Sequence, residues 1–154
     1  MSSIYPLLAA LFANVLAQVL KPVVLYLRTQ KVDIHQCIAC GGFPSSHSST
    51  VTALTMAIGL SEGFDSTYFA ITCVFSFIVI YDAANVRYYA GRNIQLTKQL
   101  ISDLEGMKGL KLNDPIYHEK IKSVLGHKFV EIIGGMILGF FVTYVSAAAF
   151  IESR

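Results

Sequence analysis

The chain has 154 residues, of which 54% are hydrophobic and 14% are charged. Soluble domains contain roughly 45–50% apolar and about 25% charged residues, so this composition excludes an ordinary water-soluble domain and predicts that lipid surrounds much of the surface. The formal net charge of +2 is far below the basic excess of a protein that neutralises many nucleic-acid phosphates, so we expect one membrane domain over residues 1–154 and no nucleic-acid partner.

The first two predicted helices differ in polarity. Residues 4–27 are apolar except for Asn14, Gln18 and Lys21, and at about 1.5 Å per residue this run is long enough to cross a hydrocarbon core of about 30 Å. Residues 46–60 follow a Gly-Gly-Phe-Pro-Ser helix start and are rich in Ser, Thr and Ala. The second helix is therefore too polar to face lipid on all sides.

Two further apolar segments complete the predicted bundle. Residues 66–81 form a nearly continuous apolar run that continues to Arg87, and residues 127–151 are interrupted only by Glu131. Both segments are long enough to cross a bilayer. The sequence therefore predicts an all-α, integral-membrane bundle of about four membrane helices.

The polar stretch at 88–126 carries two weaker helical patterns. Four residues share one face of the first pattern: Ile94, Thr97, Ile101 and Leu104. The second pattern begins with the Asn-Asp-Pro sequence at 113–115. We expect two short amphipathic helices at the membrane interface, which form an inserted lid or docking segment.

The three cysteines predict neither a disulfide framework nor a metal centre. Cys37 and Cys40 form a C-x-x-C pair, but Cys73 lies within an apolar run and His35 is the one nearby additional donor. We therefore expect free thiols, no metal and no cofactor.

The basic residues indicate an orientation in the membrane. With four crossings, residues 28–46 and 88–126 fall on one side, and eleven of the twelve Lys and Arg residues lie on or near it, with Arg154 opposite. The positive-inside tendency makes this side the cytoplasmic, stromal or matrix face. All four histidines lie on the same side.

Each predicted helix brings basic or titratable groups to this same end of the bundle. These groups are Lys21, Arg28, His47, Asp82, Arg87, His127 and Glu131. Ionisable residues in membrane segments are costly and usually face a bundle interior or a wet cavity. Permanent cations, imidazoles and the backbone donors of a helix start suit a tetrahedral oxyanion such as phosphate.

Two histidines at such a site permit chemistry as well as binding. One imidazole can attack phosphorus while the other protonates the departing oxygen. Glu131 lies four residues after His127, so its carboxylate can fix the tautomer of that ring. The residue pattern therefore indicates a candidate phosphoryl-transfer site.

Three segments carry a resemblance to a known family. They are GGFPSSHS at 41–48, YDAANVR at 81–87 and LGHKFVE at 125–131. The chain resembles, over nearly its whole length, the divergent branch of the type 2 phosphatidate phosphatase superfamily, also described as acid phosphatase/vanadium-dependent haloperoxidase-related. The superfamily signature is K-x6-R-P, then P-S-G-H, then S-R-x5-H-x3-D, on a helical bundle that transfers phosphoryl groups through a phosphohistidine.

The resemblance implies a role for each matched residue. It implies that His127 is the nucleophile, His47 the general acid and Glu131 the carboxylate that orients the nucleophile. The implied phosphate ligands are Lys21, Arg28, Ser45, Ser46 and Arg87. Thr29, Ser46 and Glu131 depart from the motif residues Pro, Gly and Asp, and 39 residues separate Arg87 from His127 in place of five. We expect Asp82 to support the site by pairing with Arg87.

A stripe of small residues runs along the last predicted helix at four-residue spacing. Its members are Gly135, Gly139, Thr143 and Ala147. Such stripes permit close helix approach in lipid, either inside one chain or with a second copy or a partner subunit.

Two functions remain open on the sequence. The first is a metal-independent membrane phosphatase or phosphotransferase, inhibited by vanadate, that acts on a phosphorylated lipid, an isoprenoid (di)phosphate or another phosphate ester. The second is a non-catalytic membrane scaffold or accessory subunit of a larger complex that keeps the phosphatase-like bundle. A haloperoxidase activity is disfavoured, because the short chain offers no evident peroxide-activating residues.

Overall fold

The computed structural model describes residues 4–30, 41–106 and 128–152, without the side chains of residues 87, 88 and 150–152. Every regular element in these ranges is a helix, which confirms the all-α prediction. The elements are α1 (Tyr5–Thr29), α2 (Ser46–Glu62), α3 (Thr67–Tyr81), the π-helical turn η2 (Asp82–Val86), α4 (Arg87–Glu105) and α5 (Phe129–Glu152). Predictions for the C-x-x-C pair, His127 and the segment at 113–125 lie outside the described residues.

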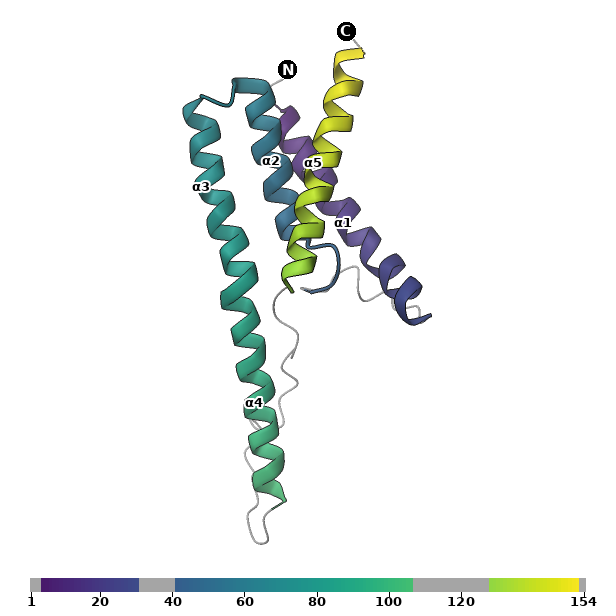
Figure 1. Ribbon diagram of the computed structural model, residues 1–154, viewed down its shortest axis with the longest axis vertical. Coiled ribbons are helices and arrows are strands. Elements are labelled where there is room, and N and C mark those ends of the chain that lie inside the picture. The colour runs from purple at the N-terminus through teal and green to yellow at the C-terminus, as the bar shows by residue number, and fades with distance from the viewer. Residues whose placement is uncertain (1–3, 31–40, 107–127, 153–154) are drawn as a thin grey trace.

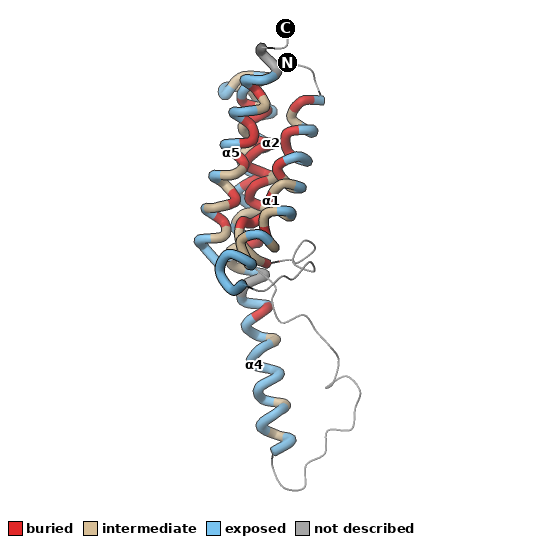
Figure 2. Tube along the Cα trace, turned by 90° about the vertical axis from the view of Figure 1, so that its right-hand side faces the viewer, coloured by how far each residue is buried: buried red, intermediate tan, exposed pale blue. Residues whose placement is uncertain are grey.

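Helix α2 is the centre of the bundle. It contacts α1, α3 and α5, and buried residues concentrate where α1, α2 and α5 meet (Figure 2). Tyr5 and Ala9 of α1 pack with Ala57 and Ala147, which places the start of α1 beside the ends of α2 and α5. Helix α1 is therefore antiparallel to both, and α5 is parallel to α2 (Figure 1).

The small-residue stripe of α5 lies against α2 within the same chain. A Cβ atom added to Gly139 would lie 2.6 Å from the carbonyl oxygen of Ser49, and one added to Gly135 would collide with the carbonyl oxygen of Ser45. Thr143 is 1% exposed, and its hydroxyl donates to the carbonyl of Ala53 at 3.2 Å. The stripe therefore permits backbone-to-backbone approach inside the monomer.

The outer surface of the bundle is apolar, as a membrane protein requires. The stretches Tyr5–Thr29, Thr67–Glu105 and Phe129–Ala149 are long and apolar enough to cross a membrane. Helix α2 has 17 residues, and most of its Ser and Thr residues are buried between the other helices. This arrangement confirms the prediction of a multi-pass bundle in which the second helix is shielded from lipid.

Helix α4 differs from the short interfacial helix expected at this position. Thr67–Glu105 is one helical stretch of 39 residues, or about 58 Å at 1.5 Å per residue, which is nearly twice a hydrocarbon core of about 30 Å. The π-helical turn at Asp82–Val86 joins α3 to α4 and does not end the helix. The polar residues after Arg87 therefore mark where the helix leaves the bundle, and α4 projects beyond it (Figure 1).

Candidate functional site

The starts of α2 and α5 meet at the end of the bundle from which α4 projects. The backbone N–H of Ser45 donates to the carbonyl of Glu131 at 2.9 Å. The turn η2 contacts both α3 and α5, and its residue Ala83 is 1% exposed. The motif segments at 41–48 and 81–87 and the start of α5 are therefore brought to one end.

Helix α1 contributes a buried cation to this end. Lys21 is 2% exposed, and it lies seven residues beyond Asn14, whose side chain donates to the hydroxyl of Thr50 at 2.8 Å. Because α1 and α2 are antiparallel, Lys21 lies about 10 Å further along the bundle axis than that bond, near the start of α2. A buried ammonium is costly in a membrane helix and marks a candidate functional position.

Arg28 is held at the second motif by an aromatic ring. Its guanidinium carbon lies 5.5 Å from the ring centroid of Phe43, within range of a cation–π interaction. The Phe43 ring also occupies the space beside Gly134, where an added Cβ would collide with it. Phe43 therefore links α1 to α5. The sequence analysis missed this role. The glycine at 134 was the sequence signal for it, because a residue without a side chain leaves room for a ring on a neighbouring segment.

Ser45 combines a capping role with a place in the second motif. Its hydroxyl accepts from the backbone N–H of Ser48 at 3.3 Å and from the Ser48 hydroxyl at 3.1 Å. Both acceptor positions of the Ser45 oxygen are thereby used, and the hydroxyl proton remains available to donate. Ser45 is fully buried, and Ser46, the first residue of α2, is 2% exposed.

His47 follows Ser46 in the first turn of α2. The side chain is half-buried, and its Nδ1 atom lies beneath the surface. The residue is thus in the first turn of α2, at the end of the helix where the positive end of the helix dipole favours an anion.

Glu131 stabilises the start of α5 in the structure. Its carboxylate Oε2 accepts from the backbone N–H of Lys128 at 3.2 Å, as the third residue of a helix does in a capping box. His127, the expected partner of this carboxylate, lies outside the described residues. The same holds for the side chain of Arg87, so its pairing with Asp82 stays a prediction.

The described residues contain no group of three or more His, Cys, Asp or Glu side chains that could hold a metal ion. Within those ranges Cys73 is a free thiol.

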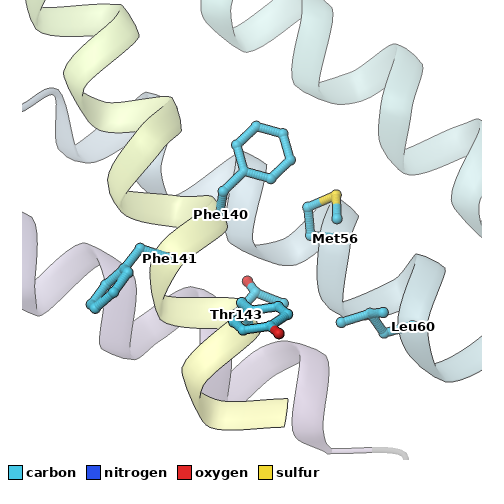
Figure 3. A pocket seen from close by; sticks show the side chains of 6 residues that line it. Met56, Leu60, Phe140, Phe141 and Thr143 are labelled. Carbon is cyan, nitrogen blue, oxygen red and sulfur yellow. The ribbon is translucent and has the colours of Figure 1, made fainter. Parts of the chain in front are cut away.

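A cavity of about 370 Å³ opens between α2 and α5, away from the cluster of motif residues. Figure 3 shows its lining, which includes Met56, Leu60 and Phe140. Met56 lies ten residues after Ser46, or about 15 Å along α2. This apolar hollow therefore belongs to the lipid-facing surface and is separate from the candidate anion site.

These features define a multi-pass helical membrane protein with a buried cation and a polar helix start at one end. The family model described as "Divergent PAP2 family" matches residues 3–142. The chain is also 34% identical over 151 residues to the "Uncharacterized membrane protein YuiD" of Bacillus subtilis (strain 168), and the alignment covers 95% of this chain and 96% of that protein. No solved structure is significantly similar to the chain.

The chain therefore belongs to the Divergent PAP2 family and is a phosphatase-related membrane protein. This membership confirms the resemblance that the three motif segments indicated.

Proposed function

We propose that the protein is a membrane phosphatase or phosphotransferase that acts on a phosphorylated lipid or an isoprenoid (di)phosphate. The observation that carries the proposal is the burial of Lys21, 2% exposed, in the same end of an apolar bundle as the start of α2. A buried ammonium and the positive end of the α2 helix dipole together favour a bound oxyanion. The lipid-exposed surface of the bundle favours a substrate that is itself held in the membrane.

The proposed reaction proceeds in two steps through a phosphohistidine. An imidazole nitrogen of His127 attacks phosphorus, the bond from phosphorus to the leaving oxygen breaks, and His47 gives its proton to that oxygen. Water then attacks phosphorus, His47 takes a proton from the water, and the phosphorus–nitrogen bond breaks to release phosphate. No metal is required for either step.

The remaining motif residues have supporting roles in the proposal. Lys21, Arg28 and Arg87 neutralise the oxygens of the phosphoryl group, and the Ser45 hydroxyl and the Ser46 backbone donate to them. Glu131 orients the His127 ring in addition to capping α5. The basic side of the bundle, and the site with it, faces the cytoplasm, stroma or matrix.

The test is a calorimetric titration of orthovanadate into the purified wild type and into a folded His127→Ala variant. His118→Ala, which removes a histidine outside the three motifs, is the matched control. We expect the wild type and His118→Ala to bind vanadate and His127→Ala to lose binding. Wild-type protein that binds no vanadate would contradict the proposal.

A second candidate function, that of a non-catalytic scaffold or accessory subunit, is favoured by the projecting helix α4. Its side chains Tyr89, Leu96 and Leu100 are 62%, 66% and 58% exposed, and their spacing places them on one helix face. An apolar face outside the bundle suits a protein partner.

Replacement of the chromosomal gene by variants of equal expression separates the two functions. Loss of the cellular function in His127→Ala supports the enzyme. Loss in a Leu96→Gln/Leu100→Gln variant, with His127→Ala retaining full function, supports the scaffold.

A further inference from the structure

Gln18 carries a buried polar atom that the proposed reaction does not use. Its side-chain oxygen Oε1 is inaccessible to solvent and receives no hydrogen bond from the residues that the structure describes. A carbonyl oxygen buried without a donor is destabilising. The position therefore calls for a donor that the described helices do not supply.

Two hydrogen bonds between α1 and α2 locate Gln18 along the bundle. The Asn14 side chain donates to the Thr50 hydroxyl at 2.8 Å, and the Ser49 hydroxyl donates to the carbonyl of Ala13 at 3.1 Å. Gln18 lies one turn beyond Asn14 on the same face of α1. Because the two helices are antiparallel, one turn along α1 corresponds to one turn back along α2, which is the level of Ser46.

The same face of α1 continues to Lys21, three residues beyond Gln18. Lys21 is 2% exposed, and Gln18 is half-buried with its Oε1 atom beneath the surface. The carboxamide oxygen and the ammonium therefore belong to successive turns of the same face of α1, beside the start of α2. The ammonium and the first backbone N–H groups of α2 can only donate hydrogen bonds, whereas Oε1 of Gln18 can only accept them. A ligand that fits all three must offer both acceptors and a donor.

We infer that Gln18 accepts a hydrogen bond from a protonated oxygen of the phosphate group bound at this end. A phosphate monoanion has charged oxygens for Lys21 and the helix start, and a hydroxyl for Gln18. Sulfate has the same tetrahedral shape but carries no proton near neutral pH. Gln18 thus makes the site select a hydrogen-bearing phosphate over sulfate. This assignment rests on the proposed function, to which it adds a specificity-determining residue.

The test compares inorganic phosphate with sulfate in calorimetric titrations of the full chain in detergent at about pH 6. Wild-type protein is expected to prefer phosphate. Gln18→Met keeps a similar unbranched shape but removes the acceptor, so the phosphate Kd is expected to rise about tenfold, as loss of one hydrogen bond predicts. The sulfate Kd is expected to stay within about twofold.

Asn14→Leu is the matched control, because it removes a carboxamide one turn away that is already bonded to Thr50. This variant is expected to unfold at a lower temperature with an unchanged ratio of the two dissociation constants. A purely structural role for Gln18, such as holding a water molecule, would likewise leave that ratio unchanged.

The outcomes separate the two proposals. A wild type that binds neither anion overturns the proposed phosphate site and the role of Gln18 with it. A wild type that binds both anions equally, or a Gln18→Met variant that keeps the wild-type preference, overturns the role of Gln18 alone. The wild-type comparison needs no variant, so it holds even where a substitution impairs folding.

Discussion

Substitution of Gly139 by alanine is expected to separate α5 from α2. The added Cβ atom would lie 2.6 Å from the carbonyl oxygen of Ser49 and 2.9 Å from Cβ of Thr52, where ordinary contacts are 3.4–4 Å. Both neighbours belong to α2, and the nearer is a backbone atom that cannot rotate away. The helices must therefore move apart by roughly 0.8 Å to restore an ordinary contact.

The magnitude follows from three opposing contributions. Overpacking of this kind costs about 2 kcal/mol. The same displacement stretches the 3.2 Å bond from the Thr143 hydroxyl to the carbonyl of Ala53 beyond useful length. The hydroxyl keeps its other acceptor, the carbonyl of Gly139 at 3.0 Å, so this loss costs about 0.5 kcal/mol. Alanine is favoured over glycine inside a helix by about 1 kcal/mol, so we expect a net loss of about 1.5 kcal/mol in the free energy of unfolding.

Unfolding in mixed detergent micelles, followed by circular dichroism, measures this loss. Gly106→Ala is the matched control, because Gly106 follows α4 and the nearest atom to an added Cβ there is 3.4 Å away. The control is expected to unfold at or slightly above the wild-type midpoint. The reasoning is refuted if Gly139→Ala is as stable as Gly106→Ala, or if it dissociates an oligomer and leaves the stability of the monomer unchanged.

Three further substitutions test separate contacts. Tyr5→Phe removes the phenol hydroxyl that donates to the carbonyl of Thr143 at 3.0 Å, so the free energy of unfolding is expected to fall by about 1 kcal/mol. An unchanged unfolding midpoint would argue against that bond. Ser45→Ala removes the acceptor for the backbone N–H of Ser48, which is expected to cost about 1 kcal/mol in the same measurement; a wild-type midpoint would argue against the capping role of Ser45. Lys21→Met removes the buried cation. Because a charged hydrogen bond is lost, the affinity for vanadate, measured by calorimetry, is expected to fall at least about tenfold. Wild-type affinity in this variant would exclude Lys21 as a ligand.

Several features of the protein follow from the sequence alone. The apolar runs and their lengths determine a helical membrane protein, because lipid cannot satisfy backbone polar groups and each spanning segment must form its own hydrogen bonds. The Ser- and Thr-rich segment at 46–60 had to be shielded, and α2 is the central helix. The motif residues lie near the ends of predicted helices, so counting the crossings predicts that they share one side of the membrane. The described residues bring the segments at 41–48 and 81–87 and the start of α5 to one end of the bundle.

Other features depended on the tertiary structure. Periodicity shows which residues share a helix face, but it does not show which neighbour covers that face. The glycine stripe of α5 therefore left two partners open, and the contacts of Gly139 with α2 select packing within the chain. For the same reason Phe43 carried no signal of its own until its ring was found between Arg28 and Gly134.

The continuity of α3 through η2 into α4 was also decided by the folded structure. A change from apolar to polar residues after Arg87 looks the same in sequence whether a helix ends or only leaves the lipid, because helix propensity differs little between these residues. Gln18 shows the same limit at the site. The sequence places a carboxamide one turn from Lys21, and only the packing of α1 on α2 leaves its oxygen buried without a donor among the described residues.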